Sequence, residues 1–279
     1  MSVTAQETGI GGIDWGAYWQ QMHDAEGAQS EAVLAAGVDS APDRWAGQAG
    51  RYAAATGRVA QPDAFMQFVL PHLRPDDRVL DIGAGAGRHA GFLAGHVAQV
   101  IAVERSPAMR MQLERRIAEQ QIPNIAVVAA DWPAAAVAEI DIAICSHVIY
   151  GVRTIVPFLQ HMDAVARRAC FISAGFRQPS YGLNRFWQHI YGEARLPLPG
   201  AMECLNVLDQ LGIRAQLNHI PASYYSFADE TEALADIRWR LRLSQSPQHD
   251  AAILAAIADI LVRDAAGRLA RPISRPTPQ

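Results

Sequence analysis

The chain contains no lysine, so all 24 of its basic residues are arginine. Without lysine the chain cannot supply the phosphate-binding lysine of a P-loop or form a Schiff base with pyridoxal phosphate. Walker-type nucleotide hydrolases and pyridoxal enzymes are therefore excluded. The formal net charge of -4 also argues against nucleic acid as the main partner.

Cysteine is scarce, and the three cysteines, Cys145, Cys170 and Cys204, lie far apart in the sequence. An odd number of scattered cysteines is typical of free thiols in a reducing compartment. No uninterrupted apolar stretch approaches the roughly 20 residues of a membrane-spanning helix, and no basic segment followed by an apolar run opens the chain. We therefore expect a cytoplasmic protein with no membrane partner.

From about residue 75 onward, short apolar segments alternate with amphipathic segments of helical length. This order indicates right-handed βαβ units, and hence an α/β fold with a Rossmann-like, doubly wound, mostly parallel sheet and helices on both faces. Seven strands are expected in total. Five of them are predicted at residues 78–82, 99–103, 125–129, 140–145 and 170–174, and the others at 213–220 and about 268–274.

Two regions fall outside this alternation and are predicted to cover the sheet. Residues 1–74 are expected to form an N-terminal helical extension or lid, and residues 75–279 the α/β domain. Within that domain, an irregular aromatic segment at about 175–200 is expected to insert as a helical, aromatic cap. A second, helical insertion is expected at about 229–264.

The most informative segment is Val79–His89, which reads as a buried strand, a glycine-rich turn and the start of a helix. A dinucleotide-binding turn has the spacing G-x-G-x-x-G, which would put its third glycine where this chain has Arg88. The chain instead has Asp81 followed by glycines at every second position from Gly83 to Gly87. A carboxylate there disfavours a pyrophosphate and a nicotinamide dehydrogenase, and favours a cationic ligand.

With this spacing, the segment resembles the first motif of the class I S-adenosylmethionine (SAM) methyltransferases. The segments Ile101–Glu104 and Ala129–Trp132 match the second and third motifs of that family. The resemblance covers about residues 75–175 and implies SAM as the methyl donor and S-adenosylhomocysteine as its product. The resemblance does not indicate which molecule accepts the methyl group.

Each acid lies at or just after the end of a predicted strand, where ligands bind a parallel sheet. Asp81 is expected to face the methionine ammonium, Glu104 both ribose hydroxyls, and Asp131 the adenine amino group, with Trp132 packed nearby. The glycines leave room for the methionine and ribose portions. The predicted cofactor-binding residues are Asp81, Gly83, Ala84, Gly85, Gly87, Glu104, Arg105, Asp131, Trp132 and Ser146.

The fourth family motif corresponds to Asp141–Tyr150, where subfamilies differ. It is not Asn-Pro-Pro-Tyr, which disfavours amino-methylating DNA enzymes, and it lacks the Pro-Cys nucleophile of cytosine C5 methylation. The predicted catalytic residues are His147 and Tyr150. His147 is either a general base for the acceptor, since its ordinary pKa is near neutrality, or a pocket-lining residue. No metal is expected.

The acceptor is expected to be a small molecule held under an aromatic lid, with O, N, C and S all open as acceptor atoms. Scattered arginines, among them Arg195, offer contacts for an anionic acceptor. An RNA or protein methyltransferase and a non-catalytic SAM-binding module are the alternatives, and the oligomeric state stays open, a homodimer included. The aromatic residues either bind substrate or pack the cap; they are Trp15, Tyr18, Trp19, Tyr181, Trp187 and Tyr191.

Overall fold

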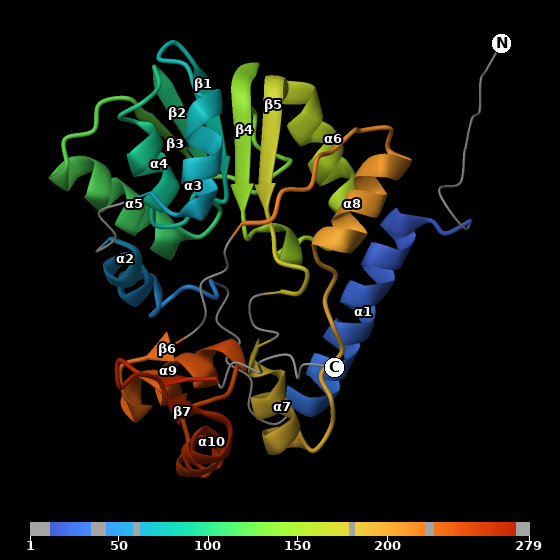
Figure 1. The fold of residues 1–279 in the computed structure, drawn as a ribbon, viewed down its shortest axis with the longest axis vertical. Helices are drawn as coiled ribbons and strands as arrows, with labels where there is room; N and C mark the ends of the chain where they lie inside the picture. The colour runs from blue at the N-terminus through green and yellow to red at the C-terminus, as the bar shows by residue number, and fades with distance from the viewer. Residues whose placement is uncertain (1–11, 35–42, 58–61, 179–181, 221–225, 272–279) are drawn as a thin grey trace. The chain divides into compact units, whose positions relative to one another are not determined.

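The computed structural model describes residues 12–34, 43–57, 62–178, 182–220 and 226–271 (Figure 1). The chain divides into two compact units, each built from several stretches of sequence. Unit 1 comprises residues 1–21, 41–176 and 199–220, and unit 2 comprises residues 22–40, 177–198 and 221–279. These limits do not follow the predicted boundary between residues 74 and 75, because the early and late segments are shared between the units.

Unit 1 contains a parallel sheet of five strands in the order β3-β2-β1-β4-β5. The predicted α/β class and the five earlier strands are therefore confirmed. The order reverses between β1 and β4, which places a topological switch point at the carboxyl ends of these two strands. The strands are β1 (Arg78–Ile82), β2 (Gln99–Val103), β3 (Ile125–Val128), β4 (Ile140–Ser146) and β5 (Ala166–Ser173).

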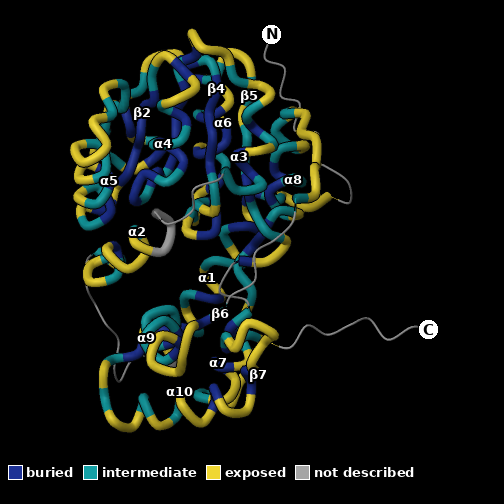
Figure 2. The backbone as a smooth tube through the Cα atoms, turned by 60° about the vertical axis from the view of Figure 1, so that its left-hand side comes forward, coloured by how far each residue is buried: buried dark blue, intermediate teal, exposed yellow. Residues whose placement is uncertain are grey.

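Alternate residues of each strand face opposite sides of the sheet, and both sides are covered (Figure 2). On one side, residues such as Leu80 belong to a core with Phe158 of α6 and Trp19 of α1. On the other, Val79 belongs to a core with Leu93 of α4 and Leu113 of α5. The helices of unit 1 are α2 (Ala49–Gly57), α3 (Ala64–Val69), α4 (Arg88–Leu93), α5 (Pro107–Glu119), α6 (Ile155–Val165) and α8 (Ala201–Gln210), with η1 (Leu70–His72), η2 (Ile149–Gly151) and the start of α1 (Trp15–Leu34).

Unit 2 has its own core, in which α7 (Asn184–Tyr191), α9 (Glu230–Arg240) and α10 (Pro247–Ile260) pack together. Its small antiparallel sheet has the order β6-β8-β7, formed by β6 (Ser226–Phe227), β7 (Val262–Arg263) and β8 (Leu269–Ala270). The helices predicted at about 229–264 are present as α9 and α10.

The predicted count of seven strands in one sheet is not reached among the described residues. Residues 213–220 form no strand, and most of them are exposed, so they lack the buried face that would fix a strand in register. The segment predicted at about 268–274 contributes β8 to the small sheet of unit 2 rather than a strand to the large sheet. No helix in the described ranges is long and apolar enough to cross a membrane.

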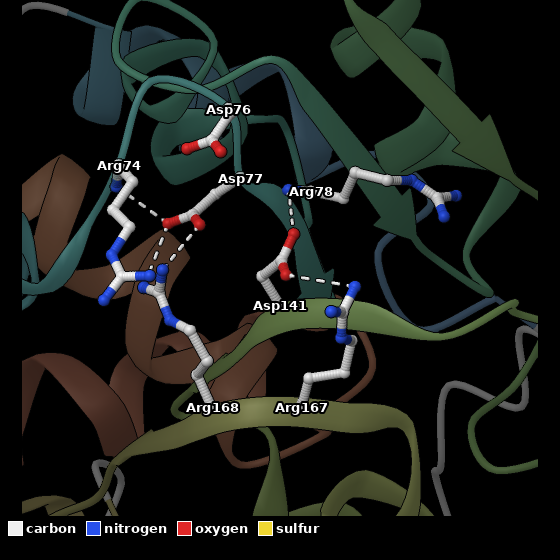
Figure 3. A pocket seen from close by; sticks show the side chains of 7 residues that line it. All are labelled: Arg74, Asp76, Asp77, Arg78, Asp141, Arg167 and Arg168. Carbon is white, nitrogen blue, oxygen red and sulfur yellow. Dashed lines mark hydrogen bonds and ion pairs between the residues drawn. The ribbon is translucent and has the colours of Figure 1, made fainter.

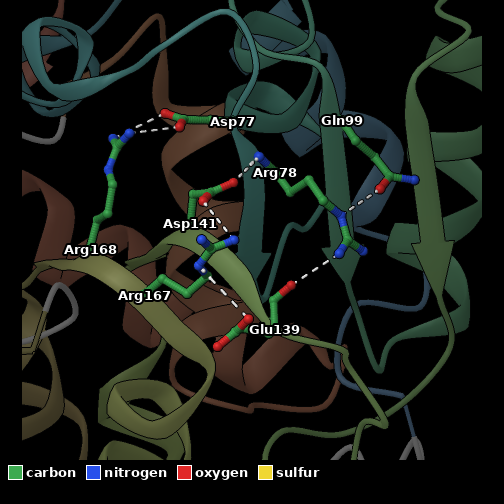
Figure 4. Close-up of polar contacts among 7 residues, drawn as sticks. All are labelled: Asp77, Arg78, Gln99, Glu139, Asp141, Arg167 and Arg168. Carbon is green, nitrogen blue, oxygen red and sulfur yellow. Dashed lines mark hydrogen bonds and ion pairs between the residues drawn. The ribbon is translucent and has the colours of Figure 1, made fainter.

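Charged side chains hold together the amino ends of β1, β4 and β5, where they line a depression on unit 1 (Figure 3). Asp77 is almost fully buried and receives two hydrogen bonds from the Arg168 guanidinium, at 2.8 and 3.1 Å. Arg168 also donates to the carbonyl of His72, and Figure 4 shows its pairing with Asp77. Its neighbour Arg167 is exposed, and the Arg167 guanidinium lies 3.7 Å from a carboxylate oxygen of Asp141. These charged pairs form a structural clamp across the amino ends of the strands, at the end of the sheet opposite the switch point.

We expect Arg168→Met to lower the free energy of unfolding by about 2–3 kcal/mol, because it leaves the buried Asp77 carboxylate without its charged partner. Arg167→Met is the matched control, and its exposed pairs predict a loss of at most about 1 kcal/mol. Urea unfolding of both variants at neutral pH measures the difference. Equal losses in the two variants would show that the Asp77–Arg168 pair is not a clamp.

Candidate functional site

The turn between β1 and α4 is built from glycines in the left-handed region, with φ of 70° at Gly83, 58° at Gly85 and 79° at Gly87. A side chain at Gly83 would meet Val148 at 2.4 Å, and one at Gly87 would meet Leu113 at 2.4 Å. A side chain at Gly85 would meet nothing within 4 Å. The outer glycines are thus needed for packing, and the middle one borders open space.

Asp81 lies within β1 just before this turn and is 1% exposed. Its Oδ2 atom is buried and has no hydrogen-bond partner in the described structure. Burial raises the pKa of Asp81 to about 6, although the nearby charge of His89 acts in the opposite direction. A buried carboxylate oxygen without a partner is costly, and a strongly shifted pKa at such a group makes it a candidate for a functional site.

Glu104 follows β2 and is buried beside the open glycine. One carboxylate oxygen accepts a hydrogen bond from the Gly85 amide at 2.8 Å, and the other accepts from the Ser106 amide at 2.7 Å. The Ser106 hydroxyl donates in turn to Asp43, which also accepts from the Ala108 amide at 3.0 Å. Asp43 thus attaches the segment before α2 to the start of α5. The sequence shows an acid near tryptophan there, and no local pattern points to this distant contact.

The third predicted acid, Asp131, is on the surface. Its side chain is 65% exposed and lies 3.5 Å from the guanidinium of Arg105, which is 69% exposed. Trp132 turns the other way, into the core, where its indole nitrogen donates to the Phe158 carbonyl at 3.1 Å. Of the remaining predicted cofactor residues, Ala84 is buried in the turn and Ser146 ends β4.

His147 follows β4 with a φ of 58°, in the left-handed region that residues other than glycine rarely adopt. Its amide donates to the Ser173 carbonyl at 2.9 Å, and its Nδ1 atom lies 3.4 Å from the Tyr150 hydroxyl. That hydroxyl also accepts a hydrogen bond from the Gly175 amide. The structure therefore brings the two predicted catalytic residues together at the carboxyl end of β4.

Reduced hydration of the His147 ring, together with the positive charges of Arg88 and His89, lowers its pKa. The imidazole is therefore largely neutral at pH 7 and can accept a proton. The side chain stays exposed, so an incoming group can reach it.

A further group of charged residues near the turn was not predicted from the sequence. Asp63 caps α3 by accepting from the Met66 amide at 2.9 Å, and it binds both Arg88 and the Nε2 atom of His89. Although burial acts to raise it, the hydrogen bonds from His89 and Met66 hold the pKa of Asp63 well below its usual range. The local signal, an aspartate before an apolar run, reveals only the helix cap.

The aromatic residues predicted to bind the acceptor do not share one environment. In unit 1, Trp19 is fully buried and its indole nitrogen donates to the Val152 carbonyl at 2.7 Å, whereas Tyr18 is 41% exposed. Trp15 is half-buried, with its amide bonded to Gln210. Trp187 and Tyr191 belong to the core of unit 2. Tyr181 lies outside the described residues.

Comparisons with known proteins agree with this architecture. Residues 79–169 match a family model described as a methyltransferase domain. Protein-L-isoaspartate O-methyltransferase 2 of Rhodopseudomonas palustris (strain HaA2) is 40% identical over 75 residues, 26% of this chain and 34% of that protein. The chain thus spans about a third of the length of the curated relatives it matches.

Two solved structures share the fold at low identity. The YcgJ protein of Bacillus subtilis is similar with a TM-score of 0.53 and 14% identity, over 74% of this chain and 92% of that one. A putative methyltransferase of Bacillus halodurans C-125 has a TM-score of 0.52 and 13% identity, over 74% and 91%.

The parallel sheet with its switch point is the fold that this chain shares with these solved structures. The match of residues 79–169 to a methyltransferase domain agrees with the resemblance of Val79–His89 to the first motif of the SAM methyltransferases.

The buried Asp81 carboxylate, whose Oδ2 atom has no partner, predicts a pH-dependent cost to the ligand-free protein. Because the pKa in the fold is raised from 3.8 to about 6, the stabilising protonated form is fully present below about pH 4 and is lost as the pH rises through 6. Asp81→Asn should remove this loss, so at pH 7.5 the variant should be more stable than the parent by on the order of 2–3 kcal/mol. At pH 4 the two should be alike.

Urea unfolding without ligand at these two pH values measures the effect. An Asp81→Asn variant that is less stable than the parent at pH 7.5 would show that the carboxylate has a structural partner.

Proposed function

We propose that this chain transfers the methyl group of SAM to a small-molecule acceptor, with the donor bound at the β1–α4 turn of unit 1. The observation that carries the proposal is the buried Asp81 oxygen without a hydrogen-bond partner, beside the same turn as the open space at Gly85. An ammonium group supplies both the positive charge and the hydrogen bonds that this oxygen lacks. The methionine part of SAM carries such a group.

The other residues of the turn fit the remaining parts of the donor. Each oxygen of Glu104 already accepts one backbone hydrogen bond and can accept another, which suits the two ribose hydroxyls. Asp131 is accessible and can accept a hydrogen bond from the adenine amino group. In this proposal, Trp132 supports the site from the core below Asp131, because its indole nitrogen is already bonded to Phe158.

When bound, SAM supplies a methyl group that its sulfonium makes electrophilic. Methyl transfer is an in-line displacement, so the protein contributes chiefly by orienting the acceptor and excluding water. His147 takes the proton of an acceptor hydroxyl or amine, since its lowered pKa keeps the ring neutral. Tyr150 positions that ring, because its hydroxyl is itself held by the Gly175 amide.

We infer a small-molecule acceptor from the composition of the chain rather than from the names of its relatives. The curated relatives are named for a protein substrate, but the similarity covers only about a third of their length. The net charge of -4 gives no support to an RNA acceptor. An RNA or protein acceptor remains the alternative.

Donor binding is tested by calorimetry with S-adenosylhomocysteine. Glu104→Gln should weaken binding by about 1–3 kcal/mol, because it removes the charge from the hydrogen bonds to the ribose. Glu114→Gln, an exposed glutamate of α5, makes the same charge change away from the turn and should leave affinity unchanged. No binding by the parent at millimolar ligand would contradict the proposed function, and equal affinities of parent and Glu104→Gln would contradict the ribose assignment.

The role of His147 is tested by transfer of labelled methyl from SAM into a small-metabolite extract. His147→Asn keeps a residue type that tolerates positive φ but removes the base, and should slow transfer by about 10²–10⁴-fold with unchanged S-adenosylhomocysteine affinity. In the parent, the rate should fall only below pH 6.5, because the pKa of His147 is lowered from that value. Normal transfer by the variant would return His147 to a pocket-lining role.

A further inference from the structure

Three neighbouring side chains of unit 2 each carry a buried polar atom without a hydrogen-bond partner. They are the indole Nε1 of Trp187, the hydroxyl of Tyr191 and the guanidinium Nη1 of Arg195. The residues are spaced by four, from α7 (Figure 1) into the segment after it. Such atoms are rare in native proteins, and each unmade hydrogen bond costs about 1–3 kcal/mol. Three such atoms on neighbouring side chains indicate a hydrogen-bond partner that the protein itself does not supply.

The three side chains are in contact with one another. The Trp187 and Tyr191 rings have their centroids 4.6 Å apart, and the Arg195 guanidinium carbon lies 4.8 Å from the centre of the Trp187 ring. The orphaned atoms therefore belong to one cluster rather than to three separate defects.

Glu26 holds one side of the Arg195 guanidinium and leaves the other without a partner. The Nε and Nη2 atoms donate to one Glu26 oxygen at 2.8 and 2.6 Å, and the Ser30 hydroxyl donates to the same oxygen at 3.0 Å. The Arg195 side chain is only 9% exposed. A buried arginine fixed in this way keeps Nη1 in a set position.

All three orphaned groups are hydrogen-bond donors. Indole and guanidinium nitrogens can only donate. Burial raises the pKa of Tyr191 to about 12, so its hydroxyl keeps its proton at neutral pH and can donate as well. Because all three groups can donate and two of them can only donate, they favour a ligand with acceptor oxygens, and a carboxylate, with two oxygens and about four acceptor positions, matches them best.

We propose that Trp187, Tyr191 and Arg195 form a binding site in unit 2 for the carboxylate of a small organic acid, with the Trp187 and Tyr191 rings against its apolar part. Because the donor atoms are covered in the ligand-free structure, the acid enters by a local opening of unit 2. The bound carboxylate then supplies the hydrogen bonds that the closed cluster lacks.

The probe is benzoate, with the neutral benzamide as its control. The chain has six tryptophans, so its nitrogen–proton NMR spectrum shows six indole signals, and Trp187→Phe identifies the one from Trp187. Benzoate at millimolar concentration should shift that signal in a saturable way, and benzamide should not. An unmoved Trp187 signal, or an equal response to benzamide, would overturn the proposal.

Two variants test the donors separately. Tyr191→Phe removes only an unpaired hydroxyl, so it should fold at least as well as the parent and bind benzoate about fivefold more weakly. Arg195→Gln should abolish binding, whereas Arg185→Gln, which changes an exposed arginine of α7, should leave it unchanged. Unaltered benzoate affinity in Tyr191→Phe would overturn the site even if Arg195→Gln fails to fold.

The benzoate experiment needs no SAM, so it is separate from the test of donor binding. If S-adenosylhomocysteine binds and benzoate does not, the carboxylate site is wrong and the donor assignment stands. If benzoate binds and S-adenosylhomocysteine does not, the donor assignment is wrong and the carboxylate site stands.

Discussion

The left-handed turn from Gly83 to Gly87 is the constraint on which the candidate site of unit 1 depends. Positive φ at alternate residues turns the chain sharply from β1 into α4, and Val148 and Leu113 occupy the space where side chains at Gly83 and Gly87 would be. The end of β4 and helix α5 thereby pack directly against the turn. This close packing gathers the carboxyl ends of β1, β2 and β4 around one open position, Gly85.

The two ends of the strands differ: the amino ends carry a stabilising ion pair, and the carboxyl ends carry the candidate site. At the amino edge, Asp77 is buried and fully paired with Arg168. At the carboxyl edge, Asp81 is equally buried but has an unpaired oxygen, and His147 holds a backbone conformation that costs energy. Two aspartates four residues apart thus differ in environment: one is paired within the sheet, and the other has an unpaired oxygen, which we propose binds the ammonium of a cationic ligand.

Features with local signals could be predicted from the sequence. The five strands follow from the alternation of apolar segments, and Asp81 and Glu104 from their places in the strand order. The hydrogen bonds of Asp43 to Ser106 and of Asp63 to His89 could not, because they join residues 63 and 26 positions apart that tertiary packing brings together. Local pattern also could not show that residues 213–220 lack a sheet partner, or that Trp19 and Trp132 turn into the core.

A crystal structure with bound S-adenosylhomocysteine tests the central claim most directly. The account predicts that the methionine ammonium contacts Asp81 Oδ2, directly or through one water, while both ribose hydroxyls lie within hydrogen-bond distance of Glu104. A ligand bound elsewhere, or one that leaves Asp81 Oδ2 buried and still without a partner, would contradict the account.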